Sequence, residues 1–254
     1  MIASALLFAV LSAHAGCPVK PGPLYKHSHN DYTRDHPLYD ALAHDFDSVE
    51  ADIHLKNGQL LVCHDSGDCH SDKSLESMYL APLYKIFQRG KGWVRPNQKP
   101  LTLLIEFKDD GEQTYRAVLP LLRKYQDMLT VASKGKVRRG AVPVVITGHV
   151  PRQTITKAEP RLMAVDGGEG DLASDASPDL VPWVSLDWDS HDRDVKDLEC
   201  RARQHHRLLR LWGGSDDEFQ WLIECAAGVD ILSTNHLTRF DRVWKDCRAL
   251  RSKS

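Results

Sequence analysis

Short apolar runs of strand length alternate along the chain with longer stretches in which apolar residues recur at helical spacing. The strand candidates are residues 23–26, 48–54, 101–107, 142–147, 162–165, 183–187, 208–212 and 230–234. Helical spacing is found over residues 37–44, 75–88, 113–125, 194–205, 216–226 and 237–250. This alternation is typical of βα units around a parallel sheet, although helices are poorly marked after the fourth and fifth strands.

The length of the chain fits one large α/β unit or two small domains. A chain of 254 residues is within the range of a single α/β barrel. No linker rich in Pro, Gly or Ser divides the sequence, and no internal repeat is visible. Because eight strand candidates match the eight strands of that fold, we predict a single-domain (β/α)₈ TIM barrel over residues 16–254.

The first fifteen residues differ from the rest of the chain. They are almost wholly apolar from Ile2 to Leu11 and end in Ala13-His14-Ala15, the small-x-small pattern that signal peptidase cleaves. The apolar run is too short to cross a bilayer as a helix. We therefore predict a signal peptide over residues 1–15 and a secreted, extracellular mature protein.

The net charge bears on the class of binding partner, and the cysteine content bears on disulfides and metal binding. The formal net charge of −2 gives no basic field, which argues against nucleic acid as a partner. In an oxidising compartment the six cysteines are expected to pair, and no Cys-x-x-Cys spacing indicates zinc. Cys63 and Cys69 enclose a short polar loop that a disulfide could close. The pairing of the other four, Cys17, Cys200, Cys225 and Cys247, stays open.

Carboxylates gather at the ends of the second and third strand candidates. Glu50 and Asp52 are two residues apart on a strand, so their side chains share one face, and the same holds for Glu106 and Lys108. In a barrel the carboxyl ends of the strands meet at one mouth. Three buried carboxylates would repel one another unless a cation neutralised them, and oxygen ligands favour Mg²⁺ or Ca²⁺. We predict that Glu50, Asp52 and Glu106 bind this metal ion.

The N-terminal half of the chain carries five short motifs. They are His27-Ser-His-Asn-Asp-Tyr32, Pro37-Leu-x-x-Ala-Leu42, Val49-Glu-Ala-Asp-Ile53, Leu60-Leu-Val-Cys-His-Asp65 and Leu104-Ile-Glu-Phe-Lys108. In combination they resemble the glycerophosphodiester phosphodiesterase and phosphatidylinositol-specific phospholipase C-like superfamily. Within it, the chain is most similar to the group named after altered inheritance of mitochondria protein six. Two later segments, Arg210-Leu-Trp212 and Gly228-Val-Asp-Ile-Leu-Ser-Thr-Asn235, agree with this resemblance.

The resemblance implies two catalytic histidines on either side of a metal-bound phosphodiester, here His27 and His64. His27 with Asn30 is also similar to the His-x-x-Asn pattern of sphingomyelinase D, which carries a small disulfide loop after its second histidine. The His-Arg-Gly of glycerophosphodiesterases is absent, since Ser28 and His29 stand in place of Arg and Gly. His29 is the main rival of His27, because its spacing of two places it near the same mouth.

The chemistry of a phosphodiester suits these residues. One histidine takes a proton from the attacking oxygen and another protonates the leaving oxygen. We assign His27 as base or nucleophile and His64 as acid, although the order could be reversed. Lys108 would neutralise charge on the phosphoryl group. Asn30 would orient a histidine or a metal ligand, and Arg210 and Trp212 would bind the phosphate and its lipid or sugar substituent unless Trp212 packs in the core.

The predicted function is that of a metal-dependent phosphoric diester hydrolase, or a lyase that forms a cyclic phosphate. Its substrates would be small-molecule or lipid phosphodiesters, either glycerophosphodiesters or phospholipid headgroups, with peripheral contact with membrane lipid. One alternative is a hydrolase related to amidohydrolases or histidinol phosphatases, in which His27 and His29 both bind metal. Another is a secreted barrel without catalytic activity that binds lipid headgroups or glycans.

Overall fold

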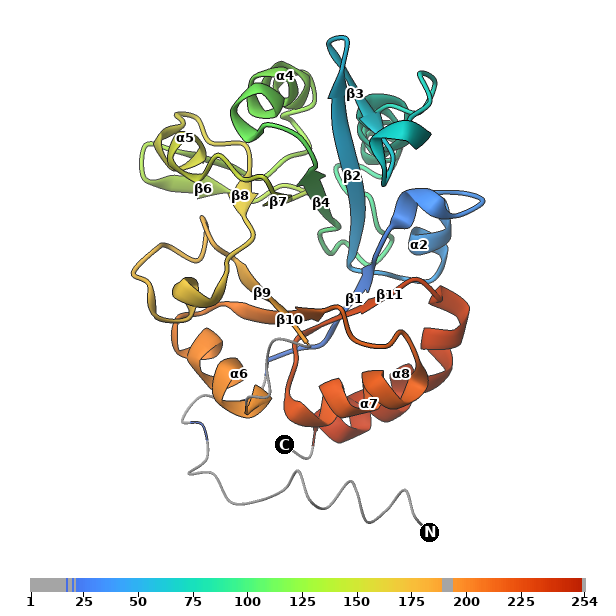
Figure 1. The fold of residues 1–254 in the computed structure, drawn as a ribbon, viewed down its shortest axis with the longest axis vertical. Coiled ribbons are helices and arrows are strands. Elements are labelled where there is room, and N and C mark those ends of the chain that lie inside the picture. The colour runs from blue at the N-terminus through green and yellow to red at the C-terminus, as the bar shows by residue number, and fades with distance from the viewer. Residues whose placement is uncertain (1–16, 18–19, 21, 189–193, 253–254) are drawn as a thin grey trace.

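The computed structural model describes residues 17, 20, 22–188 and 194–252 (Figure 1). Eight parallel strands follow one another in the order β8-β7-β4-β2-β1-β11-β10-β9. A bridge between Gly167 and Val184 joins the two ends of this order, so the sheet closes into a barrel. The strands are β1 (Tyr25–Ser28), β2 (Ser48–Lys56), β4 (Thr102–Phe107), β7 (Val144–Gly148), β8 (Ala164–Val165), β9 (Trp183–Asp187), β10 (Leu208–Trp212) and β11 (Ile231–Thr234). The predicted (β/α)₈ fold is confirmed.

Helices lie around the outside of the strands (Figure 1). The connection after β7 holds only the short helix α5 and that after β8 only a 3-10 turn, η4, which explains why helical spacing is weak there. The six predicted helices are present. They are α2 (Tyr39–Ala43), α3 (Ala81–Arg89), α4 (Gly111–Lys124), α6 (Val195–Gln204), α7 (Glu218–Ala227) and α8 (Leu237–Arg251), with α5 at Arg152–Lys157, η4 at Glu169–Ala173 and a π-helical turn, η3, at Glu76–Leu80 before α3.

Two hairpins were not predicted from the sequence. The second strand continues beyond His54 to Lys56, turns at Asn57-Gly58 and returns as β3 (Gln59–Val62), antiparallel to β2. Both turn residues have positive φ, and Asn-Gly is the residue pair that such a tight turn favours. This pair was the signal for the hairpin. A second hairpin, β5 (Val131–Ser133) with β6 (Lys136–Arg138), lies between α4 and β7.

The interior of the barrel changes from apolar to polar along the strands. Seven strands contribute an apolar residue to one small cluster, namely Tyr25, Leu104, Val145, Ala164, Trp183, Leu208 and Ile231. Side chains alternate along a strand, so the next inward position is two residues later. There the same strands carry His27, Glu106, Thr147, Asp166, Ser185, Arg210 and Ser233. An apolar plug thus fills the amino-terminal end, and a polar layer lies above it.

Three disulfides join the cysteines. Cys63 is joined to Cys69, the pairing that the sequence suggested, and the others join Cys17 to Cys200 and Cys225 to Cys247. Among the described helices, none combines the length and the apolar character that a membrane span requires. The predicted signal peptide, residues 1–15, lies outside the described residues.

Candidate active site

Three carboxylates meet where β2 pairs with the carboxyl end of β4, as the sequence predicted. One oxygen each of Glu50, Asp52 and Glu106 lies within 4.8 Å of the other two. Glu50 and Asp52 are 3% and 1% exposed. Burial and the nearby Asp52 charge raise the pKa of Glu106. The Oδ1 atom of Asp52 is buried and has no hydrogen-bond partner among the described residues. An unpartnered oxygen among converging carboxylates fits a divalent cation such as Mg²⁺ or Ca²⁺.

Lys108 supplies positive charge beside this cluster. Its Nζ lies 3.1 Å from Asp52 Oδ2 and 3.1 Å from Glu106 Oε1. Burial opposes the charged form of Lys108, but the two carboxylates outweigh burial and raise its pKa. The amine therefore stays protonated near neutral pH, where it can attract the oxygens of a phosphoryl group.

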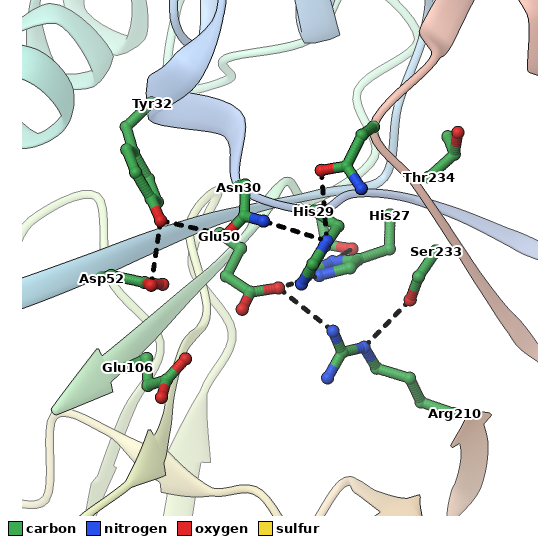
Figure 2. A network of polar contacts seen from close by, with 12 residues as sticks. His27, His29, Asn30, Tyr32, Glu50, Asp52, Glu106, Arg210, Ser233 and Thr234 are labelled. Carbon is green, nitrogen blue, oxygen red and sulfur yellow. Dashed lines mark hydrogen bonds and ion pairs between the residues drawn. The ribbon is translucent and has the colours of Figure 1, made fainter. Parts of the chain in front are cut away.

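Glu50 is fixed by two residues in the polar layer (Figure 2). Its Oε2 lies 2.7 Å from His27 Nε2 and 3.1 Å from Arg210 Nη2. Burial disfavours the ionised carboxyl, but Arg210 and His27 outweigh it and lower the pKa of Glu50 to about 2. Arg210 also donates a hydrogen bond from Nε to Ser233 Oγ, so two contacts fix its guanidinium beside Glu50.

His27 is enclosed beneath the carboxylates. Its ring is fully buried, and its Nδ1 lies 2.7 Å from Ser48 Oγ. Burial and the Arg210 charge lower the pKa of His27 to about 4. A neutral ring satisfies both contacts, since Nε2–H donates to Glu50 and Nδ1 accepts from the Ser48 hydroxyl. Both nitrogens of His27 are thus engaged by neighbouring side chains.

His29 is the next inward residue of the same segment and lies nearer the open end of the barrel. Its Nδ1 lies 3.2 Å from Asn235 Oδ1 and 3.3 Å from Asn30 Nδ2, and its side chain is partly exposed (Figure 2). Asn30 therefore contacts a histidine, as the sequence suggested, but the histidine is His29. Asn235 was missed as a site residue, although it ends the last strand where functional residues of a barrel gather.

His64 reaches the cluster from the loop that follows β3. Its Nδ1 lies 3.1 Å from Asp52 Oδ2, and 60% of its side chain is exposed. Tyr32 OH lies 2.9 Å from the same Asp52 oxygen and 3.4 Å from His64 Nδ1. The motif that contains Tyr32 indicated no role for this residue. The structure makes it a link between Asp52 and the two loops at the mouth.

The side of the mouth formed by β8, β9 and β10, opposite the carboxylates, carries further candidate binding residues. Trp212 is 46% exposed at the end of β10, so it does not pack in the core. Asp166 Oδ1 and Ser185 Oγ, which had no role assigned from the sequence, are buried and make no hydrogen bond of normal geometry among the described residues, although Ser185 and Thr147 lie close enough to Asp166 to oppose the effect of burial on its pKa. Burial raises the pKa of Asp166 to about 6. These groups leave hydrogen-bonding capacity on the side opposite the carboxylates.

A second cluster of ligand atoms, formed by His54, Cys63 and Cys69, has the spacing of a metal site. Its two cysteines are joined to each other, so neither offers a thiolate to a metal ion. The carboxylate cluster therefore remains the candidate metal centre among the described residues.

Solved structures of phosphodiesterases share the fold. A glycerophosphodiester phosphodiesterase from Parabacteroides distasonis superposes with a TM-score of 0.55 and 17% identity over 91% of this chain and 99% of the other. A calcium-dependent phosphoinositol-specific phospholipase C from Pseudomonas sp. gives a TM-score of 0.57 and 12% identity over 88% and 93%. At these identities the likeness shows the fold alone.

Proteins from fungi are similar to this chain in sequence. The altered inheritance of mitochondria protein 6 of Kluyveromyces lactis is 28% identical over 76% of this chain and 58% of its own length. A homologue from Arthroderma benhamiae is 29% identical over 59% of this chain and 55% of its own length. The chain thus spans little more than half the length of these relatives.

The family comparison covers the barrel from its N-terminal part to the end of β8. The family described as the AIM6-like phosphodiesterase domain matches residues 19–166, which is more than half of the chain. This range contains the three carboxylates, Lys108 and the histidines that surround them. The chain belongs to the AIM6-like phosphodiesterase domain family.

Proposed function

We propose that the protein is a metal-dependent phosphodiesterase that cleaves small-molecule or lipid phosphodiesters by acid and base catalysis with two histidines. One observation carries the proposal. Glu50, Asp52 and Glu106 converge with an unpartnered Asp52 oxygen, and a histidine lies on each side of them. Such a site combines a cation for the phosphoryl oxygens with groups that transfer protons near neutral pH.

The carboxylates would hold Mg²⁺ or Ca²⁺, which would act as a Lewis acid toward a phosphoryl oxygen. Arg210 and His27 support this task because they keep Glu50 ionised and fixed in place. Lys108, held between Asp52 and Glu106, adds positive charge at the same edge. These residues stabilise the negative charge that builds on the phosphoryl group in the transition state.

His64 is proposed as the acid. Asp52 accepts a hydrogen bond from its Nδ1, which leaves Nε2 for the leaving oxygen of the substrate. The base or nucleophile is one of two histidines. The role predicted for His27 stays a prediction, and its closed position favours His29 for direct contact with a substrate.

The polar groups on the far side of the mouth support recognition of the substituent on the phosphate. Trp212 offers an exposed apolar surface, and Asp166 and Ser185 offer hydrogen bonds. Glycerophosphodiesters and phospholipid headgroups combine these features, and the product would be a hydrolysed or a cyclic phosphate. All six cysteines are paired, which supports action in an oxidising extracellular compartment after removal of residues 1–15.

The alternative in which His27 and His29 both bind a metal ion is disfavoured by geometry. Both ring nitrogens of His27 already contact Ser48 and Glu50, so metal binding would require at least one contact to break. A barrel that only binds lipid or glycan has no need of three converging carboxylates with a lysine between two of them.

The direct test is a substrate panel. Purified protein is incubated with glycerophosphodiesters, lysophospholipids, sphingomyelin and phosphatidylinositol in Mg²⁺ or Ca²⁺, and products are identified by ³¹P NMR. We expect cleavage of at least one class, its loss in EDTA and its return with added metal. Full activity in EDTA would refute the metal-dependent mechanism. Absence of cleavage across the panel with both metals would count against the catalytic proposal.

A further inference from the structure

His54 is a buried histidine that the proposed reaction does not use. It lies two residues beyond Asp52 on the same face of β2 and is 6% exposed. Its Nδ1 lies 3.0 Å from Asp109 Oδ1, and its Nε2 lies 3.2 Å from the backbone carbonyl oxygen of His64. Each ring nitrogen therefore faces an acceptor oxygen, one from the segment after β4 and one from the loop after β3, and both contacts are hydrogen bonds when both nitrogens carry a proton.

Asp109 holds this ring in a defined orientation. Its second oxygen, Oδ2, accepts a hydrogen bond of 2.6 Å from the backbone N–H of Leu55. The aspartate is thus tied to β2 next to His54 and directly follows Lys108 in sequence. The segment that carries Glu106 and Lys108 is in this way connected to the backbone of His64 through one imidazole.

The backbone on either side of His64 is held at Cys63 and at Asp65, whose carbonyl accepts a hydrogen bond from the Asp68 N–H. The Cys63 N–H donates to the Asp52 carbonyl at 3.2 Å, and its side chain is bonded to Cys69. The His64 side chain is 60% exposed, and its ring makes polar contacts with Asp52 and Tyr32 in the described part of the chain. Since little packing fixes the ring, its direction depends on where the backbone places it.

We propose that His54, held by Asp109, is a positioning residue for His64. It fixes the carbonyl of His64 and thereby directs the ring that protonates the leaving oxygen. The inference rests on the proposed role of His64 as acid. An acid that is displaced by about 1 Å loses on the order of 10²-fold in rate without loss of the metal centre.

Leaving-group dependence provides the test. An alkoxide leaving group needs a proton, whereas p-nitrophenolate leaves as a stable anion. The full-length protein is assayed with metal on the dialkyl phosphodiester that it cleaves best and on bis(p-nitrophenyl) phosphate. His54→Phe removes both ring nitrogens and keeps a planar ring, His54→Gln retains a donor, and His70→Phe alters an exposed histidine of the neighbouring loop as a control.

We expect His54→Phe to lower kcat on the dialkyl substrate by roughly 10- to 100-fold, with KM and the p-nitrophenyl rate changed less than about threefold. His54→Gln should recover part of the loss, and His70→Phe should behave as wild type. If His54→Phe does not fold, Asp109→Asn should show a smaller loss with the same dependence on the leaving group. Equal losses on both substrates, or no loss on either, would overturn the inference.

The His64→Ala variant separates this inference from the proposed function. If His64→Ala loses activity equally on both substrates, then the acid role of His64 is wrong. If His64→Ala discriminates between the leaving groups while His54→Phe does not, then only the positioning role of His54 is refuted. Metal affinity, measured by calorimetry, should be unchanged in His54→Phe, which excludes an indirect effect through Asp52.

Discussion

The two sides of the barrel mouth differ in how far their polar groups satisfy one another. On the side of β1, β2 and β4, the histidines, carboxylates and Lys108 form a connected set of ion pairs and hydrogen bonds. On the side of β8 to β10, Asp166 Oδ1 and Ser185 Oγ make no hydrogen bond of normal geometry, and Trp212 is 46% exposed. The first side is held together before any ligand binds and keeps Asp52 Oδ1 unpartnered for a cation, whereas the second has fewer contacts that fix its groups.

The family match divides the molecule in nearly the same way. It ends at residue 166, so it includes the side proposed as catalytic, together with Asp166, and leaves Ser185, Arg210 and Trp212 outside. Arg210 crosses the division, because it comes from β10 and binds Glu50 at 3.1 Å.

Removal of a carboxylate from the catalytic side should give the largest effect. Glu50→Gln should weaken metal binding and lower turnover by roughly 10²- to 10⁴-fold, because the cation is asked to supply several kcal/mol of transition-state stabilisation. Calorimetry with Mg²⁺ and Ca²⁺ measures the affinity, and circular dichroism checks the fold. Asp72→Asn, at an exposed carboxylate, is the matched control. Unchanged metal affinity in Glu50→Gln would remove Glu50 from the metal centre.

Removal of His29 or His64, on the same side, should reduce turnover without loss of metal. His29→Ala and His64→Ala should each lower kcat on the order of 10²- to 10⁴-fold, because each removes a proton-transfer group. His27→Ala should instead also weaken metal binding, since His27 supports Glu50. Turnover and metal content are measured in all three variants. Loss of metal from His29→Ala would favour the alternative in which the two histidines are ligands, because the proposed site leaves His29 off the metal.

The sequence predicted which side chains face the barrel mouth. It predicted less reliably how far along the barrel axis each of them lies. Alternation along a strand places Glu50 and Asp52 on one face, and this spacing does not depend on the rest of the fold. Depth depends on the stagger between strands, which pairs His27 with Ser48 and Ser28 with Val49. No local pattern contains that stagger, so the sequence could not choose between the two histidines by position.

Long-range contacts could not be predicted from the sequence either, because they depend on how the whole barrel is assembled. The Arg210 guanidinium and Glu50 are separated by 160 residues and meet only because the barrel closes. The contact between Tyr32 and Asp52 depends on a loop that folds over the mouth. By contrast, the β2–β3 hairpin was predictable, because Asn57-Gly58 is a local turn signal that the strand assignment did not use.

The buried position of His27 should make the catalytic side sensitive to acid. The pKa of His27 is about 4 in the folded protein, against an ordinary value of 6.5. Below pH 6.5 the unfolded chain therefore takes up a proton that the folded protein refuses, so stability falls as the pH drops from 6.5 toward 4. In EDTA, the melting temperature of His27→Gln should fall less steeply over this range than that of wild type. His70→Gln should follow wild type, and an unaltered slope in His27→Gln would contradict the assignment.

The smallest expected effect belongs to the rim of the recognition side. Trp212→Ala should raise KM for the best substrate by roughly 3- to 10-fold and leave kcat within about a factor of two, because it removes apolar contact present before and during the reaction. Phe219→Ala is the matched control, since Phe219 is 61% exposed in the neighbouring α7. Equal KM values for wild type and Trp212→Ala would remove Trp212 from the binding surface. A fall in kcat at constant KM would place Trp212 with the catalytic residues, and the distinction between the two sides of the mouth would then fail at β10.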